Sequence, residues 1–220
     1  MRGKRGAAGV IFDWDGVLLD SLGCSYNVYN RIFEMIGTRR LTMDEFLALQ
    51  SPNWYDFYAK VGLPTGLWKR VDSEWMRLYE EEEPSLHPDA VECLDGLAAA
   101  GFKLALVSNG SRPRVEREVA RFGLASRFQC VVCSERAEEL KPSPIMLQRA
   151  LAVLELEPRS AVYVGDAPAD IQAAKNAGMS PIALARGPIQ KGRLQEEKPD
   201  GVFGGLTEVV AFLTAQVVGP

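Results

Sequence analysis

Two aspartates separated by one residue end the first apolar run of the chain. Residues 10–16 read VIFDWDG, so Asp13 and Asp15 follow a run that is typical of a buried β-strand. Gly16 allows the chain to turn away directly after them. Residues two apart on an extended chain point to the same side, so we expect both carboxylates to face one site. One of them can then attack as a nucleophile while the other moves a proton.

Further polar side chains follow other strand-like runs. Ser108 and Asn109 come after KLALV, and Asp166 and Asp170 come after AVYVG. Lys141 lies in the segment LKPSP, just before a predicted helix. In an open parallel sheet, ligands bind outside the carboxyl ends of the strands. We therefore expect these groups to meet at one edge of a sheet.

The carboxylates of this set predict a metal site. Three or four carboxylates near one point resist ionising together unless a cation lies among them. We expect Asp13, Asp15, Asp166 and Asp170 to share a divalent ion. Oxygen ligands without cysteine or histidine favour Mg²⁺ over zinc, and Mg²⁺ in proteins is usually shared with a phosphate group.

The remaining polar groups suit that phosphate. Lys141 offers an ammonium group, and the turn formed by Ser108, Asn109 and Gly110 offers a hydroxyl and backbone N–H groups. A metal ion and a lysine together would counter the charge of a phosphoryl group during its transfer. We expect Asp13 to form an aspartyl-phosphate. Asp15 would protonate the leaving alcohol and then activate the hydrolytic water.

The elements that must position these residues alternate between strand and helix. Strands are predicted at GVIFDWD, KLALVSNG, FQCVVCS, AVYVGDA and SPIALAR, with a weaker one at DGVFGG, and helical patterns lie between most of them. This alternation predicts an α/β fold with a parallel sheet and helices on both faces. Between the first two strands, helical periodicity without any strand indicates an inserted helical unit, with helices at about 21–36, 42–50, 53–61 and 65–82.

Composition and missing motifs exclude several classes of protein. The 220 residues carry a net charge of −4 without a basic stripe, which argues against nucleic-acid binding. No apolar stretch is long enough to span a membrane, and no signal peptide precedes the first strand, so we expect a cytoplasmic protein. The only close cysteine pair, Cys130 and Cys133, would point to opposite faces of a strand and is not expected to bind metal. The single histidine, His87, is expected in a linker.

The motifs resemble those of the haloacid dehalogenase-like hydrolase superfamily, in its phosphatase branch. The four segments that carry the resemblance, nearly from end to end, are FDWDGVLLDS, SNG, KPSP and GDAPADIQAAKNAGM. The resemblance implies a Rossmann-like core in residues 1–16 and 87–220, and a helical cap in residues 17–86. It also implies Mg²⁺ as the cofactor.

The resemblance further implies how the metal is held and which reaction follows. Its ligands would be the side chain of Asp13, the backbone carbonyl of Asp15 and the side chain of Asp166, with Asp170 as a further ligand or as an orienting residue. Dehalogenases of this superfamily lack an aspartate at the position of Asp15, so carbon–halogen cleavage is not expected. Related mutases commonly carry a glutamate where this chain has Gly165, which favours a phosphatase.

The sequence leaves the substrate and two alternative functions open. We expect a small phosphorylated metabolite as substrate, and a monomer or homodimer. A sugar-phosphate mutase and a non-catalytic phosphate-binding protein remain the alternatives. The cap residues considered for specificity, each favoured in a structural role, are Arg39, Arg40, Asn53 and Trp54. Arg112 could reach an anionic substrate, or it could belong with Arg114, Arg117 and Arg121 to a solvated helix face.

Overall fold

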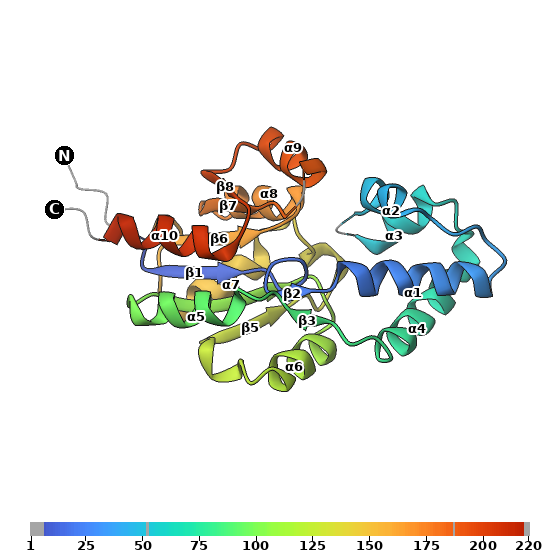
Figure 1. The fold of residues 1–220 in the computed structure, drawn as a ribbon, viewed down its shortest axis with the longest axis horizontal. Helices are drawn as coiled ribbons and strands as arrows, with labels where there is room; N and C mark the ends of the chain where they lie inside the picture. Colours follow the sequence, from blue (N-terminus) through green and yellow to red (C-terminus); the bar gives the residue numbers. More distant parts are fainter. Residues whose placement is uncertain (1–6, 52, 187, 218–220) are drawn as a thin grey trace. The chain divides into compact units, whose positions relative to one another are not determined.

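A six-stranded parallel sheet forms the centre of the larger part of the molecule (Figure 1). The structure is a computed structural model that describes residues 7–51, 53–186 and 188–217. In sheet order the strands are β5 (Cys130–Cys133), β4 (Lys103–Ser108), β1 (Gly9–Phe12), β6 (Ala161–Gly165), β7 (Ser180–Leu184) and β8 (Gly201–Phe203). The chain order reverses beside β1, which lies between β4 and β6. A ligand site is therefore expected at the carboxyl end of β1.

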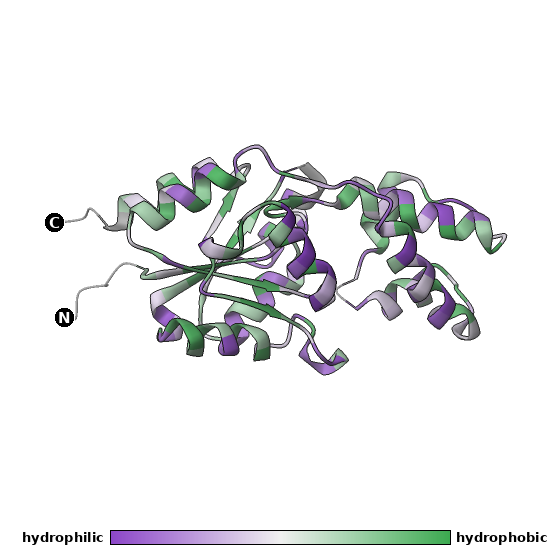
Figure 2. Cartoon of the chain, turned by 90° about the horizontal axis from the view of Figure 1, so that it is seen from below, coloured by the Kyte–Doolittle hydropathy of each residue, from purple (hydrophilic) through white to green (hydrophobic). Residues whose placement is uncertain are grey.

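Both faces of the sheet are buried because successive strand residues point to opposite sides. Val10 and Phe12 of β1 belong to one apolar cluster, with residues of α5, α6 and α10. Ile11 belongs to a second cluster, with residues of α7 and α8. Figure 2 shows the strands largely in green and the helices banded with green and purple, as expected for buried strands and amphipathic helices.

The helices of this larger part alternate with its strands, and α10 follows the last strand. Their bounds are α5 (Ala90–Ala99), α6 (Arg112–Arg121), α7 (Ile145–Leu154), α8 (Pro168–Asn176), α9 (Pro188–Glu196) and α10 (Leu206–Val217). Short 3₁₀ turns lie at η2 (Ala125–Arg127), η3 (Ala137–Glu139) and η4 (Pro158–Ser160). Each strand-to-helix loop thus opens at the same edge of the sheet.

The chain divides into two compact units, Met1–Leu19 with Leu86–Pro220, and Asp20–Ser85. The second unit is helical and contains α1 (Leu22–Met35), α2 (Met43–Leu49), α3 (Trp54–Lys60), η1 (Thr65–Leu67) and α4 (Trp68–Tyr79). Its buried core is rich in aromatic residues, and the ring centroids of Tyr29 and Phe57 lie 4.8 Å apart. The helical unit therefore has a hydrophobic core of its own.

The α/β class with a helical insertion, predicted from the sequence, is confirmed, and each of the six predicted strands is present. The four helices expected in the insertion are also present, with ends shifted by one to three residues. The prediction of no strand there needs a correction, because β2 (Leu19–Asp20) pairs with β3 (Ser85–Leu86) at the two ends of the insertion. Strands of two residues carry no periodic signal. Helices α9 and α10 were not predicted.

Two features expected from the sequence can be checked directly. Cys130 and Cys133 lie on β5, and they pack against different apolar clusters on opposite faces of the sheet, as expected. Within the described residues, no helix combines the length and the apolar character needed to cross a membrane.

Candidate active site

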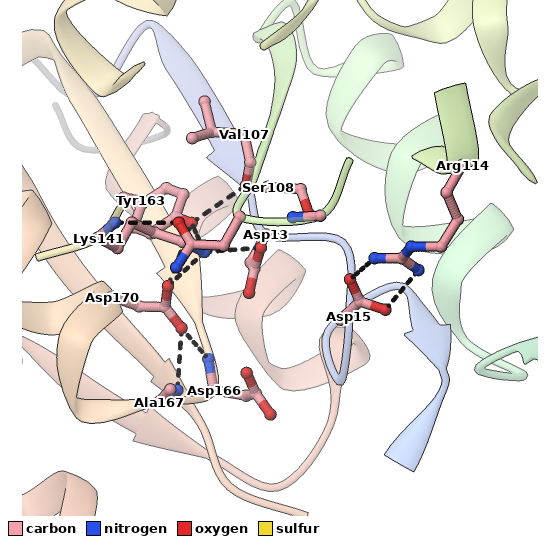
Figure 3. Close-up of polar contacts among 12 residues, drawn as sticks. Asp13, Asp15, Val107, Ser108, Arg114, Lys141, Tyr163, Asp166, Ala167 and Asp170 are labelled. Atoms are coloured by element: carbon pink, nitrogen blue, oxygen red, sulfur yellow. Dashed lines mark hydrogen bonds and ion pairs between the residues drawn. The ribbon is translucent and has the colours of Figure 1, made fainter. Parts of the chain in front are cut away.

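Asp13 and Lys141 meet at the carboxyl end of β1. Asp13 follows the last residue of that strand, and Lys141 follows the 3₁₀ turn η3 after β5. The Lys141 Nζ lies 2.8 Å from Asp13 Oδ1 and 2.6 Å from Asp170 Oδ1 (Figure 3). All three side chains are buried. The structure therefore brings Asp13 next to Lys141 and Asp170, which lie more than 100 positions further along the sequence.

Three carboxylates surround a position that suits a hard cation. Asp13, Asp166 and Asp170 can each offer one oxygen, and these oxygens all lie within 4.8 Å of one another. No cysteine or histidine of the described residues joins this group. Gly16 has a φ of +77°, and a Cβ atom there would lie 2.2 Å from Asp166 Oδ2, so a glycine is needed at this turn. An oxygen-only donor set of this kind fits Mg²⁺.

The contacts of Asp170 distinguish it from the other two carboxylates. Its Oδ2 accepts hydrogen bonds from the backbone N–H groups of Asp166 at 3.1 Å and Ala167 at 2.9 Å. Its Oδ1 lies next to the ammonium group of Lys141. Asp170 thus fixes the loop after β6 and the start of α8. Of the two roles considered from the sequence, this bonding favours an orienting residue over a metal ligand.

The turn after β4 is fixed by its own side chains. The Oγ of Ser108 accepts a hydrogen bond from the N–H of Gly110 at 2.9 Å. The Oδ1 of Asn109 accepts one from the backbone N–H of Lys141 at 3.0 Å. Asn109 therefore ties the loop that carries Lys141 to the end of β4. The turn predicted to bind phosphate lies at the correct edge of the sheet, directly beside β1.

Tyr163 lies in the site beside Lys141, although the sequence motifs did not indicate it. The Lys141 Nζ donates to the Tyr163 hydroxyl at 2.9 Å, and this hydroxyl donates to the carbonyl oxygen of Val107 at 3.3 Å. Burial, and secondly the charge of Asp13, raise the pKa of Tyr163 well above its usual value. The sequence motifs did not single out this tyrosine, which lies inside a buried strand. The available signal was that Tyr163 carries the only polar side chain of the run AVYVG.

Asp15 does not point in the same direction as Asp13. The chain bends at Trp14, which interrupts the strand alternation on which that prediction rested. The two carboxylate oxygens of Asp15 accept hydrogen bonds from Arg114 at 3.0 and 2.5 Å, and Figure 3 shows the carboxylate directed at the guanidinium group. Arg114 is buried, so the prediction that it belongs to a solvated helix face is wrong.

The charges of the site are poorly balanced without a metal ion. Burial raises the pKa of Asp13 to about 7, with Lys141 opposing and Asp170 adding to this shift. Burial and the neighbouring Asp170 raise the pKa of Asp166 well above its usual value. Burial alone would lower the pKa of Lys141, but the charges of Asp13 and Asp170 raise it well above its usual value. A single buried ammonium thus faces more carboxylates than it can neutralise.

Mg²⁺ should stabilise the protein more at about pH 8 than at about pH 5.5. The pKa of Asp13 is higher in the folded protein than the value of about 4 expected in the unfolded chain, so between these values the folded protein binds more protons. The free energy of unfolding without metal therefore falls as the pH rises from about 4 to 7. A divalent ion that binds the ionised carboxylates should offset this loss of unfolding free energy. Melting temperatures with and without MgCl₂ across this range measure the effect.

The control for this experiment is Asp166→Asn, which removes one of the three oxygens without changing the shape of the side chain. The gain in melting temperature from MgCl₂ should be largely lost in this variant. An equal gain at both pH values in the unmodified protein would contradict the proposed coupling between metal and protons.

The polar residues considered for specificity in the insertion have local partners. Arg39 pairs with Glu45, and Arg40 pairs with Glu34. Asn53 caps α3 by accepting a hydrogen bond from the N–H of Tyr55 at 3.1 Å. Trp54 packs against the core of the helical unit. Among the arginines of α6, Arg112 pairs with Glu116 and Glu135 at the surface.

Known proteins resemble this chain over nearly its whole length. Pyrophosphatase PpaX of Bacillus mycoides (strain KBAB4) is 24% identical over 212 residues, which cover 93% of this chain and 96% of that protein. The predicted phosphoglycolate phosphatase of Haemophilus somnus has a crystal structure that matches with a TM-score of 0.83 and 22% identity, over 94% of this chain and 97% of that one. The crystal structure of CbbY from Rhodobacter sphaeroides in complex with phosphate matches with a TM-score of 0.78 and 21% identity. The match covers 94% of this chain and 99% of that one.

These structural matches establish the shared fold, and the family follows from the sequence. The sequence model of the haloacid dehalogenase-like hydrolases matches residues 10–184. This match contains all four segments that carried the resemblance. The chain therefore belongs to the haloacid dehalogenase-like hydrolase family, as its motifs predicted.

Proposed function

We propose that the protein is a Mg²⁺-dependent phosphomonoester hydrolase that acts on a small phosphorylated metabolite through an aspartyl-phosphate on Asp13. The observation that carries this proposal is the buried contact of 2.8 Å between Asp13 and Lys141, beside the carboxylates of Asp166 and Asp170. A nucleophilic carboxylate, a fixed cation and a cation site thus lie together. The pyrophosphatase and phosphoglycolate phosphatase names among similar proteins support phosphate ester or anhydride hydrolysis.

In the first half of the reaction, a carboxylate oxygen of Asp13 attacks phosphorus. The P–O bond to the leaving group breaks, and the protonated carboxyl group of Asp15 gives its proton to the leaving oxygen. The ammonium group of Lys141 lies next to Asp13 and counters negative charge on the transferring oxygens. Products of this half are the free alcohol and the phosphorylated Asp13.

In the second half, the carboxylate of Asp15 takes a proton from a water molecule that attacks the phosphorus of the aspartyl-phosphate. The acyl phosphate bond breaks, inorganic phosphate leaves, and both aspartates return to their starting states. Asp170 acts through its hydrogen bonds, which hold the loop of Asp166 and the ammonium group of Lys141 in place.

The proposed ligands of Mg²⁺ are the side chains of Asp13 and Asp166 and the backbone carbonyl of Asp15. When bound, the ion would offset the charge of the phosphate group and of the clustered carboxylates. We further propose that the helical unit, predicted from the sequence at residues 17–86 and found as the compact unit Asp20–Ser85, acts as the cap of this active site.

Steric restriction at Gly165 supports hydrolysis over the mutase reaction. A Cβ atom at this position would lie 2.2 Å from the Cβ of Asp170, so any side chain there would displace Asp170. The glutamate that related mutases commonly carry at this position therefore conflicts with the packing of this site. The presence of both aspartates and the lysine also argues against a non-catalytic binding protein.

A panel of small phosphorylated compounds, assayed with and without MgCl₂, tests the proposed function. The panel should include phosphoglycolate and inorganic pyrophosphate, because these are the substrates that the names of similar proteins suggest. We expect phosphate release from at least one compound, and only with the metal. Incubation with β-glucose 1-phosphate separates the alternative, since a mutase would produce glucose 6-phosphate instead of free phosphate. Ligand binding without turnover on any compound would favour a non-catalytic protein.

A further inference from the structure

A second cluster of buried charges lies beside Asp15. Arg114 and Glu118, on the first two turns of α6, have side chains that are only 5% and 6% exposed. One guanidinium nitrogen of Arg114, Nη1, lies 3.0 Å from Asp15 Oδ1 and 3.1 Å from Glu118 Oε2, while Nη2 lies 2.5 Å from Asp15 Oδ2. Arg114 therefore connects the two carboxylates, and each carboxylate oxygen of Asp15 accepts a hydrogen bond from this one planar group.

The guanidinium group is held in place from two further directions. The indole N–H of Trp14 donates to Glu118 Oε2 at 2.7 Å, and Trp14 is itself fully buried. On the other side, a Cβ atom at Gly110 would lie 2.2 Å from Nη2 of Arg114. The close approach of the guanidinium to the turn after β4 thus depends on the absence of a side chain at Gly110.

Fold stability alone gives a weak reason for this arrangement. Burying two charged side chains costs desolvation free energy, and apolar residues of similar volume often stabilise a protein as well as or better than a buried ion pair. The bidentate contact fixes the orientation of the Asp15 carboxylate, because a planar guanidinium group determines the plane of the carboxylate that it binds. The carboxylate it fixes is the proposed proton donor, which remains 34% exposed and so accessible to a substrate.

We propose that Arg114 is a positioning residue for Asp15, and that Glu118 and Trp14 hold its guanidinium group in place. This inference rests on the proposed function, in which Asp15 protonates the leaving group. Each carboxylate oxygen keeps a second lone pair beside the one bound by Arg114, so the bidentate contact leaves a site for proton transfer. In this proposal Arg114 acts through the orientation of Asp15.

The first test compares substrates that differ in their need for a proton. The value of kcat/KM reports the steps up to phosphorylation of Asp13, and p-nitrophenolate leaves readily without protonation, whereas an alkoxide does not. For Arg114→Met we expect kcat/KM to fall by about 10- to 100-fold with an alkyl phosphate and by less than about 3-fold with p-nitrophenyl phosphate. Asp15→Asn should give the same pattern with a larger loss. Arg114→Lys, which keeps the charge but not the planar fork, should restore part of the activity.

The matched control is Arg117→Met, which removes an exposed arginine from the same helix. This variant should leave kcat/KM unchanged for both substrates. Glu118→Gln should give a weaker form of the Arg114→Met pattern, and it supplies a second variant if Arg114→Met does not fold. Equal losses on both substrates for Arg114→Met and Glu118→Gln, or no loss on either, would overturn the inference.

Crystal structures of the same variants provide a readout that does not depend on activity. In the Arg114→Met protein we expect the Asp15 carboxylate to rotate away or to occupy several conformations, while Asp13 and Lys141 keep their contact. An unchanged, single orientation of Asp15 would overturn the positioning role even if the wild-type protein were inactive on every substrate. Failure of the proposed function would instead appear as absent turnover in the wild type with Asp15 still ordered by Arg114.

Discussion

Replacing Asp13 by asparagine should reduce kcat/KM by roughly 10⁴- to 10⁶-fold, the range seen when a nucleophile is removed from other enzymes. The amide has nearly the shape of the carboxylate, but it cannot attack phosphorus. It should not destabilise the protein, because burial and the nearby acidic groups already disfavour the ionised form of Asp13, whose pKa is about 7. Without metal at about pH 8, we expect an equal or higher melting temperature than that of the wild type.

Loss of activity with retained stability separates a chemical role from a structural one. Phosphate release and acid-quench trapping of the phosphorylated enzyme measure the activity, and thermal melting measures the stability. The matched control is Asp95→Asn. The carboxylate of Asp95 pairs with Arg127 at the surface, so its replacement should leave turnover unchanged. A variant at Asp13 that kept one tenth of the wild-type rate would rule out this residue as the nucleophile.

Replacing Lys141 by methionine should affect both stability and activity. Its buried ammonium group contacts Asp13 and Asp170 at 2.8 and 2.6 Å, so its loss leaves two buried carboxylates without their cation. Breaking such a buried pair costs about 3–5 kcal/mol of unfolding free energy. The loss should be smaller at about pH 6 than at about pH 8, because burial and Asp170 raise the pKa of Asp13, and the variant also loses the ammonium group that lowers this pKa, so Asp13 takes up a proton more readily at the lower pH.

Turnover by the Lys141→Met variant should fall by roughly 10²- to 10³-fold, as when a fixed donor to a developing charge is removed. Addition of MgCl₂ should recover part of the stability, since it supplies positive charge to the same carboxylates, but little of the activity. Lys103→Met is the matched control. Its ammonium group donates to the carbonyl oxygen of Leu154 and lies at the start of β4, away from the site. If the two methionine variants behaved alike in both assays, Lys141 would have no special role.

The sequence by itself determined the sheet and the positions of the acidic residues at its edge. Buried strands such as AVYVG read as continuous apolar runs, because a parallel sheet covered by helices on both faces excludes water from every strand residue. The polar residues that follow these runs must then lie at the carboxyl ends of the strands. These patterns were sufficient to predict that Asp13, Asp166 and Lys141 lie at one site.

Tertiary structure alone decided which partner each polar side chain has. The carboxylate of Asp15 and the guanidinium of Arg114 lie 99 residues apart in sequence, and Trp14 lies 104 residues from Glu118. No periodicity relates such positions. The pattern of arginines on α6 indicated a solvated face, because helical spacing does not reveal that the loop after β1 covers the first turns of that helix.

The same reason explains the roles of Asp170, Asn109 and Tyr163. Asp170 was predicted as a ligand or an orienting residue and Asn109 as a phosphate contact, and Tyr163 was not predicted, yet each forms a hydrogen bond or ion pair that fixes Lys141. Hydrogen bonds depend on distances of a few tenths of an ångström between segments that only packing brings together. The sequence pattern therefore determines which polar groups reach the site. Packing determines which of them are placed to react and which position the reacting groups through hydrogen bonds and ion pairs.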